Sequence, residues 1–158
     1  MPLIHLTTLI DAPAQRVFDL SRSINLHTLS TRHTGEVAVG GVMNGLIGLN
    51  ETVTFRARHL FKVRTHTSVI SAMEAPVFFI DEMVKGDFKR FRHEHHYKPI
   101  DNGTIMIDLL DFESPYGIVG QCFDKFYLTG YLTDFLKKRN IVIKEYAESE
   151  KWKAVLSF

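Results

Sequence analysis

Two histidines and an aspartate are placed where they could move protons. Residues 89–98 alternate between two sets of side chains, which predicts a β-strand with His93 and His95 on one face. The next strand follows a turn at residues 102–103 and would place Asp108 on that same face. An imidazole beside a carboxylate can keep one tautomer and transfer a proton near neutral pH. We therefore take His93, His95 and Asp108 as candidate catalytic residues.

The hairpin between these two strands predicts which residues oppose each other. Asn-Gly at residues 102–103 suits a two-residue turn in which both residues have positive φ. With that turn, His95 faces Leu110 and His93 faces Phe112. These pairs would all lie on the inner face of the sheet.

The inner face is expected to mix aromatic and ionisable side chains. In residues 51–61 the odd-numbered positions are the more apolar set, so they are assigned to the interior. Buried ionisable groups are costly unless they are paired or hydrogen-bonded. Their presence therefore indicates a binding site or a polar network. The expected ligand-binding residues are Glu51, Phe55, His59, Asp81, Phe91, His93, His95, Tyr97, Asp108, Phe112 and Phe126.

The same residues are compatible with a metal site or with a purely structural network. The pair His93 and His95 places two imidazoles about 6.6 Å apart along one strand face, and Asp108 or Glu51 could add a ligand. This pattern is short and common by chance, so no metal and no other cofactor is expected. Alternatively, the histidines and carboxylates only bond each other across strands, or they orient one polar end of a ligand.

The elements that position these residues follow from periodicity and turn signals. A strand over residues 3–10 precedes two short helices, over 14–21 and 23–30. A sheet that must bury one face against a single helix curls around it. The predicted fold class is α+β, with a strongly curved antiparallel sheet of about six or seven strands around a long C-terminal helix. The later strands are expected over 36–39, 51–61, 63–74, 77–85 and 89–98 and before the turn at 114–117, and the long helix over 118–148.

The long helix is expected to have an apolar side and a wet side. Phe126 and Tyr131 belong to the apolar side, which would close the cavity against the sheet. Asp124, Lys138 and Arg139 are assigned to the side that faces water.

Length and composition indicate one domain, over residues 1–148, with a tail over residues 149–158. A chain of 158 residues is long enough for a real core, and a net charge of +1 creates no field that would attract nucleic acid or an acidic membrane. Cys122 is the only cysteine, which excludes a disulfide framework and favours a reducing compartment. The sequence shows no signal-peptide pattern and no run near the roughly 18 apolar residues of a membrane span. A cytoplasmic location is expected.

Several segments resemble a known superfamily. They are IDAP at residues 10–13, VFDL at 17–20, GLIGL at 45–49, FIDEMVKG at 79–86, FRHEH at 91–95 and PYG at 115–117. Together they resemble the START/polyketide-cyclase superfamily, often abbreviated SRPBCC, and within it a bacterial subgroup of uncharacterised ligand-binding proteins. This resemblance implies the helix-grip fold of the birch-pollen allergens. Its members carry lipids or plant hormones, cyclise or dehydrate polyketides, or act as chaperone cofactors, so the fold alone does not specify the function.

Three functions are carried forward from the sequence. The first is a protein that binds a small apolar or aromatic molecule in a cavity between sheet and C-terminal helix. The second is an enzyme of the cyclase or dehydrase type, in which His93 or His95 acts with a carboxylate within about 3.2 Å. The third is a protein-interaction module, with a filled interior and a contiguous exposed apolar patch. No nucleic-acid partner is expected, and the oligomeric state is left open.

Overall fold

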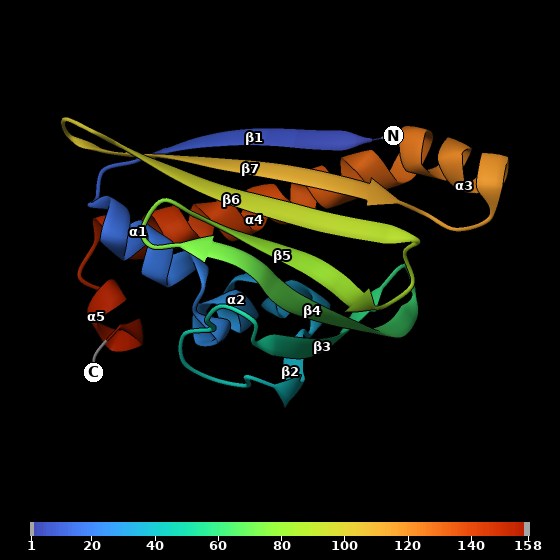
Figure 1. Cartoon of the computed structure of the whole chain (residues 1–158), viewed down its shortest axis with the longest axis horizontal. Coiled ribbons are helices and arrows are strands. Elements are labelled where there is room, and N and C mark those ends of the chain that lie inside the picture. Colours follow the sequence, from blue (N-terminus) through green and yellow to red (C-terminus); the bar gives the residue numbers. More distant parts are fainter. Residues whose placement is uncertain (1, 157–158) are drawn as a thin grey trace.

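The computed structural model describes residues 2–156, and these form one seven-stranded antiparallel sheet with a long C-terminal helical run (Figure 1). The strand order is β1-β7-β6-β5-β4-β3-β2, so the first strand lies beside the last one. The predicted α+β class, with a curved sheet around a C-terminal helix, is confirmed. The strands are β1 (Leu3–Ile10), β2 (Val37–Gly41), β3 (Thr52–His59), β4 (Lys62–Glu74), β5 (Phe78–Lys85), β6 (Arg90–Ile100) and β7 (Gly103–Glu113).

The two short helices after β1 form where they were predicted. Helix α1 begins after Pro13, and α2 begins after Ser23, whose hydroxyl accepts a hydrogen bond from the backbone N–H of Leu26 at 3.1 Å. Both helices contact the C-terminal helix α4. The helices are α1 (Ala14–Ser21), α2 (Ile24–Ser30), a 3-10 turn η1 (Arg32–Thr34), α3 (Gly117–Phe123), a π-helical segment η2 (Asp124–Leu128), α4 (Thr129–Glu148) and α5 (Trp152–Val155). None of the described helices is long and apolar enough to cross a membrane.

The core lies between the sheet and these helices. Phe18 of α1 is fully buried and its ring makes edge contacts with Phe79 of β5 at 5.7 Å and with Tyr97 of β6 at 5.5 Å. On the C-terminal run, leucines at a spacing of four, Leu132 and Leu136, give one buried stripe. Burial of this stripe fixes which face of α4 meets the sheet.

The side of the C-terminal run that faces inward differs from the expected one. Asp124 and Arg139 were assigned to water but are buried, with 0% and 4% of their surfaces exposed. Asp124 accepts hydrogen bonds from the backbone N–H and the hydroxyl of Ser114, which ties the end of β7 to the helix. The segment η2 is wider than an α-helix, so it rotates the residues before α4 relative to an uninterrupted 3.6-residue period. A single helical period therefore assigned the wrong face to several side chains.

The β6–β7 hairpin is shifted by two residues from the expected register. Ile100 pairs with Gly103, so the turn consists of Asp101 and Asn102 rather than Asn102 and Gly103. His95 therefore opposes Asp108, not Leu110. The reason for glycine at this position is space, because a Cβ on Gly103 would lie 2.2 Å from the Ile10 carbonyl oxygen.

The C-terminal segment packs on the helices. The guanidinium of Arg16 lies 4.3 Å from the centre of the Trp152 ring, and Leu156 is buried in the same core cluster as α1. These contacts hold α5 against the domain. Residues 157–158 of the expected tail lie outside the described part of the chain.

Candidate functional site

A cavity of about 650 Å³ lies between the inner face of the sheet and the helices α2, α3 and α4. Two features define it: a mainly apolar wall and two groups of polar side chains. Its size lies within the range of small-molecule sites in proteins. The apolar wall includes Ile24, Ile47, Val53, Phe55, Ala57, Ile70, Phe79, Phe88, Phe91, Leu110, Leu132, Phe135 and Leu136.

Six residues expected to bind a ligand line this cavity. On β3, Phe55 and His59 point inward, while the intervening Arg56 and Arg58 are exposed. This alternation is the geometry of a half-buried strand. As ligand-binding residues, the six remain predictions. They are Phe55, His59, Asp81, Phe91, His93 and His95.

Two expected cavity residues face water instead. Glu51 is exposed, because β3 begins only at Thr52, and its carboxylate accepts a hydrogen bond from the backbone N–H of Gly48 at 2.7 Å. Phe126 is 79% exposed, because it lies in the π-helical segment next to α3, which extends past the end of the sheet in Figure 1. A helical segment without a sheet opposite cannot bury all its apolar side chains.

Three other expected cavity residues point inward but do not reach the cavity. Tyr97 packs against Phe18, where α1 closes one end of the sheet. Phe112 is fully buried and contacts the ring of Phe88 at 6.1 Å. Asp108 is also fully buried, behind the two histidines. Orientation toward the interior is thus necessary but not sufficient for contact with a ligand.

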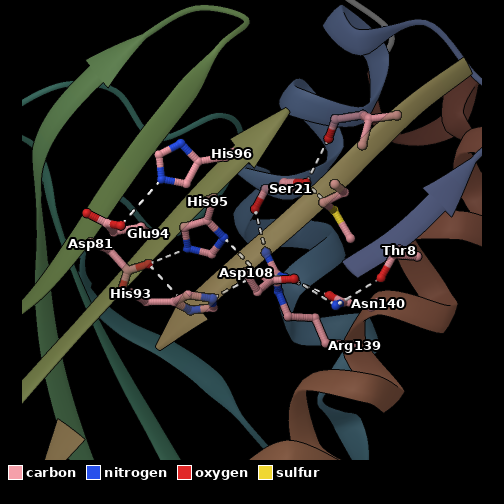
Figure 2. Close-up of polar contacts among 12 residues, drawn as sticks. Thr8, Ser21, Asp81, His93, Glu94, His95, His96, Asp108, Arg139 and Asn140 are labelled. Carbon is pink, nitrogen blue, oxygen red and sulfur yellow. Dashed lines mark hydrogen bonds and ion pairs between the residues drawn. The ribbon is translucent and has the colours of Figure 1, made fainter. Parts of the chain in front are cut away.

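Asp81, His93, His95 and Asp108 form one connected polar network across three strands (Figure 2). His93 Nε2 lies 2.8 Å from Asp108 Oδ1, and His95 Nε2 lies 2.6 Å from Asp81 Oδ2. The two imidazoles lie against each other, with 3.8 Å between their ring centres and an angle of 34° between their planes. Because these contacts join β5, β6 and β7, the network also fixes the register of the strands.

The far side of Asp108 is bound by the C-terminal helix (Figure 2). Asn140 donates a hydrogen bond from Nδ2 to Asp108 Oδ2 at 2.8 Å, and Arg139 Nη1 lies 3.5 Å from Asp108 Oδ1. Arg139 also donates to Asn140 Oδ1 at 3.0 Å and to the Ser21 carbonyl oxygen at 3.4 Å. Asp108 therefore joins the helix to the histidines that line the cavity.

Burial and charge act in opposite directions on the network's carboxylates. Burial raises the pKa of Asp108, but its hydrogen bond with His93, the adjacent imidazole of His95 and the charge of Arg139 outweigh burial and hold the pKa well below its usual value. In the same way, the hydrogen bond from His95 overcomes burial and lowers the pKa of Asp81 to about 2. Burial and the neighbouring His95 lower the pKa of His93. Both acids are thus carboxylates at neutral pH, and His93 favours its neutral form.

A second polar cluster lines the same cavity, and only one of its members, His59, was among the sequence-based candidates. Glu36 is 8% exposed, and its carboxylate lies 2.6 Å from His27 Nε2 and 3.8 Å from His59 Nε2. His59 Nδ1 is in turn 2.6 Å from the Tyr131 hydroxyl. Glu36 lies just before β2 and His27 on α2, so no shared periodicity connects them in the sequence. The only sequence signal was His59, which was expected to face inward.

Solved structures with low sequence identity share the architecture of this chain. The protein TTHA0849 from Thermus thermophilus superposes with a TM-score of 0.75 at 16% identity, over 99% of this chain and 100% of that chain. A START superfamily protein from Mycobacterium smegmatis gives 0.70 at 13% identity, over 90% and 97% of the two chains. The chain has the START-like helix-grip fold. Ginseng major latex-like protein 151 from Panax ginseng gives 0.68 at 15% identity, over 94% and 98%.

The START-like fold is thereby confirmed, but the comparisons add nothing finer. A scan of the chain against protein-family models and a search of curated proteins found no match. Likeness at these identities shows the fold alone, and one fold can host many functions. The function of this START-like chain has to be argued from its cavity and its two polar clusters.

The polar groups of the cavity are suited to three tasks. Both imidazole–carboxylate pairs are short enough for proton transfer. The same groups can hydrogen-bond a polar group of a ligand whose remainder contacts the apolar wall. Asp81, His93 and His95 each also offer one metal-ligating atom, and these atoms lie within 4.8 Å of one another.

Because of the Glu36 cluster, we expect the protein to lose stability at acid pH. Burial disfavours the charged form of Glu36, but His27 and His59 overcome it and lower the pKa from 4.5 to about 2. Because the folded pKa is depressed, the stabilisation is present above pH 4.5 and is lost as the pH falls toward 2. A shift of this size corresponds to about 3 kcal/mol. We expect Glu36→Gln to remove this contribution.

The measurement is the free energy of unfolding in urea between about pH 6 and pH 2.5, for wild type and for Glu36→Gln. The difference between the two proteins should shrink as the pH falls, because protonation of Glu36 abolishes the interactions that the variant already lacks. Glu145→Gln, at an exposed ion pair with Lys151, is the matched control and should show little such dependence. A difference that stays constant across this range would contradict a depressed pKa of Glu36.

Proposed function

We propose that this protein binds one small, largely apolar molecule in the cavity between its sheet and its C-terminal helix. The observation that carries this proposal is the cavity of about 650 Å³, whose wall is mainly apolar and includes two clusters of hydrogen-bonded polar side chains. An apolar wall favours a ligand with little polar surface, and a few polar groups orient it. We propose that Asp81, His93 and His95 contact one polar group of the ligand, and that His27 and Glu36 contact another.

The cavity also favours this function over that of a protein-interaction module. A protein-interaction module would have a filled interior, whereas this interior holds space for a ligand.

Cys122 is the only cysteine of the chain and is exposed. An exposed thiol persists best in a reducing compartment, so we propose that the protein acts in the cytoplasm.

A cavity-filling substitution tests the proposal. Ser68 lines the cavity and is 6% exposed, so Ser68→Phe should occupy part of the space. We expect the fluorescent probe 1-anilinonaphthalene-8-sulfonate to bind wild type at one molecule per chain and Ser68→Phe at least tenfold more weakly. A fluorescence titration measures both affinities. Native mass spectrometry of freshly purified wild type should show a co-purifying small molecule that Ser68→Phe lacks.

The matched control is Ser71→Phe, which adds the same side chain to an exposed position of the same strand. It should bind the probe within about twofold of wild type, provided that both variants keep the wild-type circular dichroism spectrum. Probe binding that is equal in wild type and Ser68→Phe would place the probe on the surface, for instance at the exposed Phe126, and would overturn the proposal.

A second candidate function, acid–base catalysis on the bound molecule, is favoured by the short distance between His93 and Asp108. A dehydrase would remove a proton from a carbon of the ligand and protonate the departing hydroxyl group, which leaves as water. If this reaction occurs, His93→Gln should retain a molecule that is heavier by one water than the molecule found in wild type. Recovery of the same molecule from both proteins would contradict catalysis by His93 and would support binding without a reaction.

A further inference from the structure

Three side chains from two neighbouring strands converge at one point of the cavity wall. Asp81 on β5 pairs directly with His93 on β6, and His95 lies two residues further along β6 on the same face. Asp81 Oδ2 is 2.6 Å from His95 Nε2 and 4.0 Å from His93 Nδ1. Two imidazoles and one carboxylate are the donor set of several mononuclear sites for first-row transition metals.

The inner carboxylate, Asp108, lies behind both imidazoles, where it can hold them in the orientation that such a site needs. Its Oδ1 atom is 2.8 Å from His93 Nε2 and 3.4 Å from His95 Nδ1. If these two nitrogens carry the protons, the opposite nitrogens, His93 Nδ1 and His95 Nε2, present lone pairs on the side of Asp81 (Figure 2). A carboxylate behind a ligating histidine is the usual way in which proteins fix its tautomer and its ring orientation.

A buried atom without a hydrogen bond supports the arrangement in which His93 Nε2 and His95 Nδ1 carry the protons. His95 Nδ1 is buried and, among the atoms that the structure describes, makes no hydrogen bond of acceptable geometry. When His95 Nε2 shares its proton with Asp81, Nδ1 has no proton to donate to Asp108. A cation bound between Asp81 and Nε2 replaces that proton, so that Nδ1 can carry one and donate it.

The charges of the network also favour a cation. The network contains two carboxylates, Asp81 and Asp108. The guanidinium of Arg139 contacts Asp108. With neutral imidazoles, these groups leave one negative charge uncompensated in a largely buried site, which is costly. A divalent cation bound at the site reverses this imbalance.

We propose that Asp81, His93 and His95 bind a divalent transition-metal ion of the zinc type at the cavity wall, with Asp108 positioning both imidazoles. Two imidazole donors favour zinc, cobalt or iron over magnesium and calcium, which prefer oxygen ligands. Three protein ligands leave a coordination position open toward the cavity. The site does not depend on the proposed apolar ligand, because its three ligands belong to the protein.

The test uses Zn²⁺ and Co²⁺ as probes on chelator-treated full-length protein. Isothermal titration calorimetry should show one Zn²⁺ per chain, and Co²⁺ should give the visible absorption bands of a protein-bound ion. Asp81→Asn and His95→Ala should each weaken Zn²⁺ binding at least tenfold. His96→Ala is the matched control, because this imidazole lies on the outer face of the same strand and is bonded to Glu94. It should bind Zn²⁺ like wild type.

Three outcomes would overturn the proposal: no stoichiometric Zn²⁺ binding by wild type, unchanged binding by Asp81→Asn, or an equal loss in His96→Ala. The melting temperature of each variant is measured in parallel. If His95→Ala is unfolded, Zn²⁺ binding by Asp81→Asn tests the proposal. This substitution keeps the side-chain size, and the position is only partly buried. Probe binding in the Ser68→Phe series reports the apolar cavity separately, so the two proposals can fail independently.

Discussion

Replacing Asp108 with alanine should lower the free energy of unfolding by about 3–5 kcal/mol. The side chain is fully buried and contacts His93, Asn140 and Arg139. Its removal leaves the guanidinium of Arg139, itself only 4% exposed, without a compensating charge in the interior. A buried ion without its partner costs far more than the pair contributed, because the desolvation cost remains.

Urea denaturation at about pH 7 measures this loss, with Asp111→Ala as the control on the same strand. Asp111 forms a half-exposed ion pair with Arg90 at 2.7 Å, so its removal should cost no more than about 1 kcal/mol. The double variant Asp108→Ala/Arg139→Met should be more stable than Asp108→Ala alone, because the unpaired charge is gone. A double variant that is less stable than Asp108→Ala would show that the unpaired charge of Arg139 does not destabilise the folded state.

A large contrast is expected between two phenylalanines that were both assigned to the cavity wall. Phe112 is fully buried against Phe88 and its neighbours, so Phe112→Ala should cost about 3–5 kcal/mol. Phe55 is half-buried, and part of its ring faces the cavity, so Phe55→Ala should cost less than about 2 kcal/mol. The difference arises because a packed ring leaves a new void when it is removed, whereas Phe55 already adjoins one.

The two variants are compared by the same urea denaturation, in protein stripped of any co-purifying ligand. Addition of 1-anilinonaphthalene-8-sulfonate should stabilise wild type and Phe112→Ala, provided that the latter folds, and should stabilise Phe55→Ala less. Equal losses in the two alanine variants without ligand would show that the ring of Phe55 is packed as tightly as that of Phe112.

The inner face of the sheet was predictable because side chains in a strand alternate strictly. Alternation in residues 89–98 assigned His93 and His95 to the interior, and both line the cavity. The hairpin register was wrong by two residues, yet Asp108 still lies on the inner face, because a shift of two preserves the face of every side chain. An error of one residue would have moved Asp108 to the outside.

Contacts between distant elements could not be predicted in this way. Arg139 looked like a surface residue of an amphipathic helix, and its burial is explained by its contacts with Asp108 and with the Ser21 carbonyl oxygen. Glu36 and His27 come from different elements, and α2 and β2 bring them together at the cavity. Phe126 was expected to be buried because the helical pattern does not show where the sheet ends.

The sequence by itself determined the order of the main elements, the curved sheet around a terminal helix, and the inner face of the strands that alternate clearly, at residues 51–61 and 89–98. These features follow from local periodicity and turn chemistry, which each segment carries independently of the others. Only the tertiary structure decided which inward side chains border a cavity and which are packed. It also decided that Asp108 serves both the histidines and the C-terminal helix. Such pairings depend on distances between segments far apart in the chain, and close packing of the folded chain sets those distances.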